Sequence, residues 1–493
     1  MMKPQEKDKM EKDDELELEE EREETEEEIE AYNRAISDLN SHASAHGSVA
    51  IPRTDPSSPT VRAVKACLEA LGLDDAALAA LRVVHVTGTK GKGSTAALVA
   101  AALGASGVPR VGLYTSPHLR DVRERIRVSG RAIGRGAFAR CYAHIVAACP
   151  PPALAALGYF PLLTVLALAH FARARCGAVV LEVGVGGRTD ATNVVARPAV
   201  CAVAALGLDH TAALGATVAD IAWEKAGIFR PGVPALAAPH QPAAALAVLR
   251  ARAAEFGTVL TVAGEDEGDG DGSAASTAVL TEAAGAHMHG AFQRTNAVLA
   301  AAAVRAWWAQ HGAALEAGGA RLRIAEGFRA CVWPGRAQTL VRGACTLHID
   351  GAHTPESLAA CVEWFAQCLR ARPVGTDAAG NALVFACKGD RAPDVLLTAL
   401  ADACAANGVT FARVVCVQLQ PCAAFHSAST LCDAARTHLP ACREVMPADS
   451  AQDALALCAD TPAVLVTGSL YLVSEVLAAA DYNTTDPLWP SKL

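Results

Sequence analysis

From about Val61 onward, short and continuously apolar runs alternate along the chain with longer segments rich in Ala and Leu. Continuously apolar runs are typical of strands that are buried on both faces of a parallel sheet, because neither face of such a strand meets water. The longer segments have the length of helices that connect neighbouring parallel strands. The alternation therefore predicts an α/β fold.

The pattern predicts two series of strands, separated by the stretch "WPGR" at residues 333–336. The expected strands span residues 83–87, 110–114, 178–183, 199–204, 346–350, 383–387, 414–419 and 463–467. Helices fit between them, for instance over residues 94–103, 161–174, 355–370 and 469–480.

Breaks in the pattern predict the domain organisation. We expect a disordered acidic tail and leading segment at residues 1–48, a larger α/β domain at 49–334 and a smaller one at 335–493. The acidic, low-complexity stretch "GEDEGDGDGSAAS" at residues 264–276 is interpreted as a surface loop inserted into the larger domain.

The acidic charge is concentrated at the N-terminus. Residues 1–30 contain 16 acidic and 5 basic residues, so the formal net charge of −9 leaves about +2 for the remaining 463 residues. A charge run of this kind is usually a solvated extension without chemistry. The nearly neutral remainder gives no reason to expect a nucleic-acid partner.

The 16 cysteines are scattered singly, and none is paired as Cys-x-x-Cys. A disulfide framework or a zinc cluster would need paired spacing or an exporting N-terminus, so we expect reduced thiols in a cytoplasmic protein. Residues 145–172 contain no Asp, Glu, Lys or Arg, but prolines and a glycine interrupt them. We therefore expect a buried helix there and no membrane span.

The stretch "HVTGTKGKGSTAAL" at residues 85–98 lies between an expected strand and an expected helix. Backbone N–H groups of a glycine-rich turn and of the following helix N-terminus suit a phosphate group, which Lys92 would neutralise. The standard phosphate loop has Ser or Thr directly after Gly-Lys, whereas here Gly93 intervenes before Ser94 and Thr95. An ordinary glycine turn capped by Ser94 is the weaker alternative.

Glu182 stands near the end of an expected buried strand, directly before the glycine-rich turn of "LEVGVGGRTDATN". Burying a carboxylate is costly unless the group is paired or binds a metal. Because ligands of open parallel sheets bind at the carboxyl ends of the strands, Glu182 is a candidate magnesium ligand. A salt-bridged structural glutamate is an equally good interpretation of this residue alone.

The stretch "LGLDHTAALGATVADIAWEKAGIF" at residues 206–229 places Asp209 and His210 at the end of the next strand, and it places Lys225 on the helix that follows. None of these residues is decisive by itself. A lone histidine is more often a hydrogen-bonded core or surface residue than a ligand.

In the second series, "LHIDGAHTPES" at residues 347–357 repeats this arrangement with Asp350 and His353. An acid at a strand end can hold ribose hydroxyls, and a nearby histidine can meet a phosphate. With Arg336 upstream, this suggests that the second domain closes over a nucleotide. A capped strand–helix turn is the alternative.

In order and wording, these stretches resemble the successive signatures of the folylpolyglutamate synthase family, a branch of the ATP-dependent, amide-forming Mur ligases. The resemblance runs from about residue 32 to residue 476. It rests on "VTGTKGKGST", "TSPHLRDVRERIRVSG", "EVGVGGRTDATN", "LGLDHT", "IAWEKAGIF", "GAFQRTNA", "WPGR", "DGAHT" and "VTGSLYLV".

The resemblance implies a P-loop-type ATPase domain with a mostly parallel sheet, followed by a smaller Rossmann-like α/β domain. It implies that ATP is bound by Gly88, Gly91, Lys92, Gly93, Ser94, Thr95, Gln293, Asn296, Arg336, Asp350 and His353. It further implies Mg²⁺ ligation by Ser116, Glu182 and His210. Lys225 would correspond to a lysine that relatives carry as a carbamate, and Lys92, His210 and Lys225 would be the catalytic set.

The implied reaction is the ATP-dependent ligation of L-glutamate to the γ-carboxyl of tetrahydrofolate or a folylpolyglutamate through an acyl phosphate, giving ADP and phosphate. The implied cofactors are ATP and Mg²⁺, and the family allows a monovalent cation in addition. We expect small-molecule partners only (reduced folate, L-glutamate and ATP), a monomer, and a cytoplasmic location that does not exclude a mitochondrial form.

Two departures keep other activities open. The motif "GGRTD" with Arg188 resembles the corresponding motif of dihydrofolate synthases and bifunctional bacterial enzymes more than that of animal folylpolyglutamate synthases. The alternative activity is therefore the addition of the first glutamate to dihydropteroate, alone or in a bifunctional enzyme. At Ala386 relatives commonly carry Asn, which affects the expected glutamate pocket. A catalytically silent nucleotide-binding protein is a further alternative, against which Lys92, Glu182, His210 and Lys225 argue.

Overall fold

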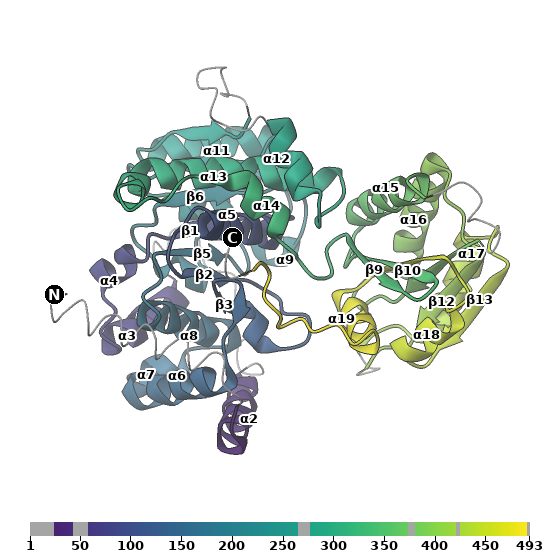
Figure 1. The fold of residues 1–493 in the computed structure, drawn as a ribbon, viewed down its shortest axis with the longest axis horizontal. Helices are drawn as coiled ribbons and strands as arrows, with labels where there is room; N and C mark the ends of the chain where they lie inside the picture. The colour runs from purple at the N-terminus through teal and green to yellow at the C-terminus, as the bar shows by residue number, and fades with distance from the viewer. Residues whose placement is uncertain (1–23, 43–57, 265–276, 373–379, 421–423, 491–493) are drawn as a thin grey trace.

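The computed structural model describes residues 24–42, 58–264, 277–372, 380–420 and 424–490. Residues 1–23 of the acidic tail and residues 265–276 of the expected insertion lie outside this description. The described chain forms two bodies, each built around its own sheet, as Figure 1 shows. Both sheets are mostly parallel, which confirms the predicted α/β fold class.

The first sheet has the strand order β4-β3-β2-β5-β1-β6-β7-β8. The neighbouring strands β2, β5, β1, β6, β7 and β8 pair in parallel. At one edge, β3 pairs with β2 and β4 pairs with β3 in the antiparallel direction. Its strands are β1 Val84–Thr87, β2 Val111–Tyr114, β3 Ile126–Val128, β4 Arg131–Ala132, β5 Ala178–Glu182, β6 Val200–Val203, β7 Ala235–Ala237 and β8 Leu260–Val262. The four strands predicted here are confirmed to within one residue at either end.

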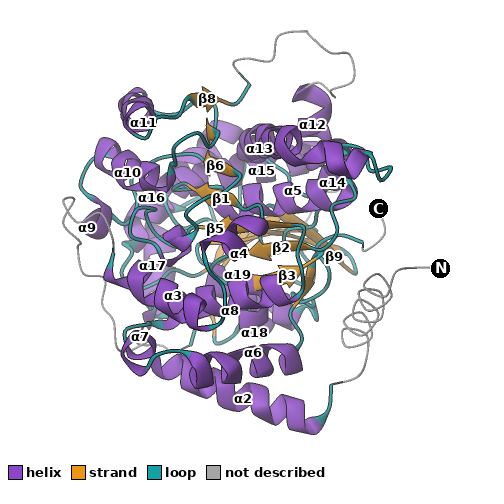
Figure 2. Ribbon diagram, turned by 90° about the vertical axis from the view of Figure 1, so that its left-hand side faces the viewer, coloured by secondary structure: helices purple, strands orange, loops and turns teal. Residues whose placement is uncertain are grey.

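Helices cover both faces of this sheet (Figure 2). Helices α5, α13 and α14 enclose one apolar core, and α3, α6 and α8 enclose the other. The helices of this body are α2 Glu26–Ser41, α3 Pro59–Ala70, α4 Asp75–Ala80, α5 Lys92–Ala105, α6 Arg135–Ala148, α7 Pro151–Ala155, α8 Tyr159–Arg173, α9 Thr211–Leu214, α10 Val218–Lys225, α11 Ala243–Glu255, α12 Thr277–Ala284, α13 Ala291–Glu316 and α14 Ile324–Ala330.

Two segments of this body refine expectations from the sequence. Helix α2 forms within the leading segment that was expected to be disordered, because Tyr32, Ala35 and Leu39 bury one side of it against the body. Helix α8 is the buried helix expected within residues 145–172, and it begins at Tyr159 rather than Pro161. Among the described residues, no helix has the length and apolar character that crossing a membrane requires.

The second sheet has the order β13-β12-β11-β14-β10-β9, parallel except for β9. Its elements are β9 Gln338–Arg342, β10 Cys345–Ile349, α15 Pro355–Arg370, β11 Asn381–Phe385, α16 Pro393–Asn407, β12 Arg413–Val417, α17 Ala428–His438, β13 Glu444–Ala448, α18 Ala451–Leu457, β14 Ala463–Thr467 and α19 Leu470–Ala479. The four predicted strands are confirmed to within two residues. The unpredicted β9 and β13 are half-exposed edge strands without a continuous apolar run.

The chain crosses between the two bodies twice. After α19 it runs back to the larger body (Figure 1), where Leu488 and Trp489 are buried in the core around α5. There Leu488 N donates to Gly130 O at 3.1 Å, and Val332 N, next to the first crossing, donates to Leu488 O at 2.8 Å. The predicted boundary at residues 334 and 335 thus lies beside the returning C-terminal segment.

Candidate active site

The glycine loop, residues 88–91, connects β1 to α5. Helix α5 begins at Lys92, two residues before the predicted start. Gly91 has a φ of +82°, and a Cβ there would lie 2.1 Å from Asn296 Oδ1 on α13. Only glycine therefore fits at position 91, and the loop is pressed against α13.

Two backbone N–H groups of this loop are already hydrogen-bonded within the protein. Thr89 N and Lys90 N donate to Ala205 O at 2.9 and 3.1 Å. By contrast, no side chain caps α5, and the first N–H groups of a helix have no partner within it. The anion-binding capacity of the segment is therefore concentrated at the start of α5, where Gly93, Ser94 and Thr95 lie.

Two hydroxyl groups at the start of α5 differ in their partners. Ser94 Oγ accepts from Gln293 Nε2 at 3.4 Å, and Asn296 Nδ2 donates to Gln293 Oε1 at 2.7 Å. Thr95 Oγ1 is buried and has no hydrogen-bond partner among the described residues. A buried hydroxyl without a partner is costly, so this position suits an oxygen-rich ligand.

Glu182 ends β5, the strand between β1 and β2. Its Oε2 accepts from Ser116 N at 2.8 Å, and a Cβ on Gly93 would lie 3.3 Å from the same oxygen. Burial raises the pKa of this carboxyl, while Lys92 and the Ser116 N–H group oppose the shift. The acid thus lies against the start of α5, because β5 and β1 are adjacent parallel strands that end at the same edge of the sheet.

Two lysines share this part of the site. Lys225, at the end of α10, is 3% exposed and donates from Nζ to Gly88 O at 2.8 Å. Burial holds its pKa well below the usual lysine value, and the charge of Lys92 adds to the shift. Burial also lowers the pKa of Lys92, although Glu182 acts in the opposite direction. The structure therefore brings Lys92, Lys225 and Glu182 together.

His210 lies at the edge of this cluster. It precedes α9 with a φ of +50°, its side chain is exposed, and its ring makes no hydrogen bond with any described residue. Although the residue is largely exposed, partial burial of the ring lowers its pKa, and the nearby lysines add to this shift while Asp209 opposes it. Asp209 itself pairs with Lys90, its Oδ2 lying 3.2 Å from Nζ. This lysine–aspartate pair was not predicted as a site feature.

The second body contributes Arg336, Asp350 and His353. Burial lowers the pKa of Arg336, and the charges of Asp350 and Glu182 oppose this shift, so Arg336 acts on an acid of the first body. Asp350 Oδ2 accepts from Ala337 N at 2.8 Å. His353 Nδ1 lies 2.8 Å from Gly351 O, and the charge of Lys90 contributes to the lowering of its pKa by burial. Charges of the first body thus act on Arg336 and His353, and Asp350 is linked to this surface through Arg336.

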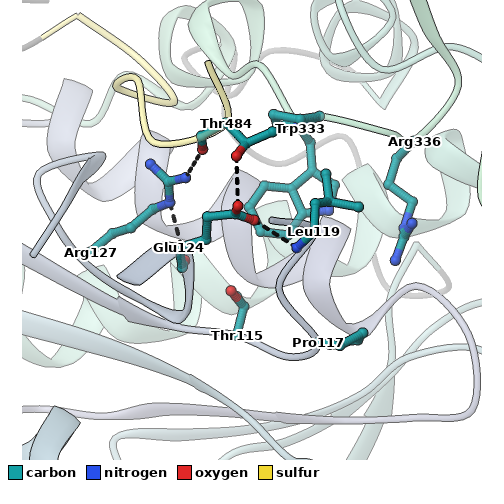
Figure 3. A pocket seen from close by; sticks show the side chains of 9 residues that line it. Thr115, Pro117, Leu119, Glu124, Arg127, Trp333, Arg336 and Thr484 are labelled. Carbon is teal, nitrogen blue, oxygen red and sulfur yellow. Dashed lines mark hydrogen bonds between the residues drawn. The ribbon is translucent and has the colours of Figure 1, made fainter. Parts of the chain in front are cut away.

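A pocket at this junction contains residues that the sequence did not single out (Figure 3). Its lining comes from the segment after β2, from the first crossing at Trp333 and from the returning C-terminal segment at Thr484. Glu124, Arg127 and Thr484 are all buried and hydrogen-bonded to one another there. They lie up to about 360 positions apart, so no local pattern could reveal them.

The donor set limits which metal would fit. Among the described residues, no three His, Cys, Asp or Glu side chains gather in an arrangement that could hold a metal ion by themselves. The predicted set has one carboxylate, one hydroxyl and one imidazole. A cation that keeps waters and shares phosphate oxygens, as Mg²⁺ does, fits such a sparse oxygen-rich set better than a metal that needs a full protein cage.

Comparisons with known proteins were made at the level of sequence and structure. No family model matches the chain. The mitochondrial folylpolyglutamate synthase of Bos taurus is 37% identical over 391 residues, which are 74% of this chain. The chain is thus a homologue of folylpolyglutamate synthases. The match spans 65% of the length of the bovine protein.

Solved structures extend the family likeness to nearly the full chain. The Mycobacterium tuberculosis folylpolyglutamate synthase complexed with ADP has a TM-score of 0.71 and 26% identity, covering 92% of this chain and 99% of that one. A bifunctional folylpolyglutamate synthase/dihydrofolate synthase from Yersinia pestis, complexed with AMPPNP and a Mn ion, has a TM-score of 0.68 and 27% identity, covering 91% and 98%. Folylpolyglutamate synthase structures thus share both bodies.

Proposed function

We propose that the protein ligates L-glutamate to the γ-carboxyl of tetrahydrofolate or a folylpolyglutamate, with hydrolysis of ATP to ADP and phosphate. The observation that carries the proposal is the meeting of the two bodies at Glu182, where the charge of Arg336 acts on an acid that lies against the start of α5. A ligase needs such a junction, because ATP and the acceptor carboxylate must meet away from water.

In the first step, a γ-carboxylate oxygen attacks the γ-phosphorus of ATP, the bond to the bridging oxygen breaks, and ADP leaves. Both reactants are anionic, so their approach needs positive charge. Lys92 and the N–H groups at the start of α5 provide it, with Gly88, Gly91 and Gly93 allowing close approach. Ser94, Thr95, Gln293 and Asn296 line the same helix start.

Glu182, Ser116 and His210 hold Mg²⁺ in this proposal, and the binding of a Mn ion by the Yersinia pestis relative supports a divalent cation. When bound, Mg²⁺ supplies positive charge that offsets the charge on the transferred phosphoryl group. The lowered pKa of His210 keeps its ring neutral near pH 7, the form in which imidazole binds metals. A monovalent cation is part of the proposal as well.

Lys225 is proposed to carry a carbamate. Its lowered pKa favours the neutral amine, which is the form that attacks the carbon of CO₂. The N–C bond forms as one C=O π bond of CO₂ breaks, which leaves a carboxylate, and the amine proton passes to solvent. The result is an anion beside Lys92. An anion at this position would attract the Lys92 ammonium group, whereas a protonated Lys225 would repel it.

In the second step, the amine of L-glutamate attacks the acyl carbon. The amide C–N bond forms, the C–O bond to phosphate breaks, and phosphate and a proton leave. Arg336, Asp350 and His353 of the second body contact ATP in this proposal, and their position facing the first body supports it. Exclusion of water protects the acyl phosphate from hydrolysis.

The proposed setting is a cytoplasmic monomer with small-molecule partners, and a mitochondrial form belongs to the proposal because the bovine relative is named as mitochondrial. The finer domain assignment, with an ATPase domain at 49–334 and a ligase domain at 335–493, is proposed on the separate sheets of the two bodies.

The test is to incubate the protein with ATP, Mg²⁺ and labelled glutamate, and to offer tetrahydrofolate and dihydropteroate separately. Label transfer to tetrahydrofolate supports the proposal. Transfer to dihydropteroate alone would overturn it in favour of a dihydrofolate synthase, and transfer to both would indicate a bifunctional enzyme, as in the Yersinia pestis neighbour. In the structure Arg188, the residue that favours the dihydropteroate alternative, pairs with Glu224 at 3.1 Å.

A further inference from the structure

Glu124 makes an unusual set of contacts for a buried carboxylate. Its Oε2 accepts from Leu119 N at 2.7 Å, and its Oε1 accepts from Arg120 N at 2.9 Å and from Asp121 N at 2.8 Å. Oε1 also accepts from the hydroxyl of Thr484 at 2.6 Å. Figure 3 shows the carboxylate between Leu119 and Thr484. One side chain therefore binds three consecutive N–H groups and a distant hydroxyl.

These contacts fix a segment that has a site residue at one end. Residues 115–121, here called the junction loop, begin beside Ser116, whose N–H group binds Glu182. Toward its other end, Leu119 packs against the apolar core of the second body, and its side chain lies about 3.4 Å from where a Cβ of Gly335 would be. A shift at residues 119–121 would therefore displace both Ser116 and the contact with the second body.

The same acid anchors the chain that returns from the second body, residues 480–490, here called the return segment. Besides the Thr484 hydroxyl, buried Arg127 donates from Nη2 to Thr484 O at 2.5 Å and from Nη1 to Asp486 O at 2.9 Å. Arg127 also donates from Nε to the main-chain oxygen of Glu124 at 3.2 Å. Arg127 thus bonds the main chain of Glu124, and the hydrogen bonds to the carboxylate of Glu124 come from the three N–H groups and the Thr484 hydroxyl.

We infer that Glu124 is a positioning residue that holds the junction loop and the return segment as one unit, and thereby sets the place of Ser116 and the fit between the bodies. This inference rests on the proposed function for its effect on turnover. Hydrogen bonds to a carboxylate are strong, and three from N–H groups together with one from a hydroxyl on the same buried group leave little freedom.

Substitution of Glu124 by glutamine tests this role with little change of shape. Glutamine has one oxygen and one NH₂ group in place of two acceptors. Whichever way the amide turns, its NH₂ group faces an N–H donor of the junction loop, so at least one of the four bonds becomes a repulsive contact. Thr484→Val removes the hydroxyl bond alone and leaves the loop bonds in place.

The experiment compares full-length wild type with Glu124→Gln, Thr484→Val and two controls. Glu326→Gln removes one negative charge from an exposed position on α14. Leu249→Ala removes a buried side chain of α11, remote from the junction, and controls for general loss of stability. The readouts are the rate of tryptic cleavage after Arg120 and Arg123, the affinity for ADP, the melting temperature, and kcat for glutamate ligation.

We expect Glu124→Gln to be cleaved at least about fivefold faster after Arg120 and to lose about tenfold in kcat, since small misplacements in a site have such effects. Its affinity for ADP should stay within about twofold of the wild-type value, because the glycine loop follows β1 and the junction loop follows β2. Thr484→Val should also raise the rate of cleavage after Arg120 and lower kcat, but by smaller factors than Glu124→Gln. Neither control should change the cleavage pattern.

The inference is overturned if Glu124→Gln is cleaved like wild type, if it keeps full kcat, or if Leu249→Ala with a similar loss of melting temperature is cleaved just as fast. If Glu124→Gln does not fold, Thr484→Val decides by the same two readouts. Absence of glutamate ligation in the wild type would overturn the proposed function instead, and cleavage would still report on the junction loop.

Discussion

The two walls of the candidate site are built in different ways. One wall consists of the ends of β1, β5 and β2, and its residues lie at or shortly after the ends of these strands in sequence: Glu182 ends β5, Ser116 follows β2, and Lys92 follows the glycine loop after β1. The wall across the junction combines the loop after β2, the first crossing at Trp333 and the return segment at Thr484 (Figure 3). The first wall depends on local sequence, and the second depends on tertiary assembly.

This difference separates chemistry from positioning. In the strand-end wall the buried charges act on one another: Lys92 and Glu182 shift each other's pKa, and Lys92 lowers the pKa of Lys225. The assembled wall carries mostly main-chain hydrogen bonds to Glu124 and Arg127, which fix geometry. Substitutions in the first wall should therefore abolish a step, whereas substitutions in the second should degrade it.

The largest effect is expected for Lys92→Ala. Loss of this charge leaves two anions to react without compensation, so glutamate ligation should fall by at least about 10³-fold while the fold stays intact. Circular dichroism and steady-state turnover measure the two quantities. Lys90→Ala is the matched control, because Lys90 is half-exposed and paired with Asp209, and its loss should be far milder. Unchanged turnover in Lys92→Ala would refute the role of the strand-end wall.

A second strong effect is expected for Gly91→Ala. The added Cβ would lie 2.1 Å from Asn296 Oδ1 on a backbone with φ of +82°, so ADP affinity should fall about 10- to 100-fold. Calorimetric titration with ADP measures this. The double variant Gly91→Ala/Asn296→Ala should recover part of the affinity, because it removes the clash but not the strained φ. Equal affinities of the two variants would place the defect in the backbone alone.

How much of the site could be foreseen follows the same division. Parallel strands that end at one edge bring Glu182 and the segment after β1 together, so strand prediction sufficed to place Glu182 at the ligand-binding edge. Ser116 was singled out by the family resemblance alone. The short or half-exposed strands β3, β4, β7, β8, β9 and β13 carry no long apolar run and were not predicted. Glu124 could not be singled out, because its partner Thr484 lies 360 positions away.

A moderate effect is expected for Arg336→Gln, which removes the cation that the second body presents to Glu182. We expect kcat to fall about tenfold, since a single charge aimed at the reacting groups is lost. Steady-state kinetics with varied ATP measures this. Exposed Arg329 on α14 supplies the control variant Arg329→Gln, which should leave kcat unchanged. A loss of ADP affinity with kcat preserved would assign Arg336 to nucleotide binding alone.

The smallest effect is one of stability, for Glu182→Gln. Burial raises the pKa of Glu182 in the folded state above its unfolded value, so the ionised carboxylate costs the fold stability at neutral pH, and the cost disappears as the pH falls below the unfolded value. Glutamine keeps an acceptor for Ser116 N without the charge. We expect its melting temperature to exceed that of wild type by about 2–4 °C at neutral pH, which is the shift that about 1 kcal/mol gives in a large domain.

This gain should shrink as the pH is lowered through the raised pKa of Glu182, because protonation of the wild-type carboxyl removes the same charge. Differential scanning calorimetry of both proteins between neutral and mildly acidic pH measures the trend. A difference that grows on acidification would mean that the ionised carboxylate stabilises the fold through Lys92 and Ser116. Glu182 would then be a structural ion-pair partner, and the strand-end wall would resemble the assembled wall in holding geometry rather than charge for chemistry.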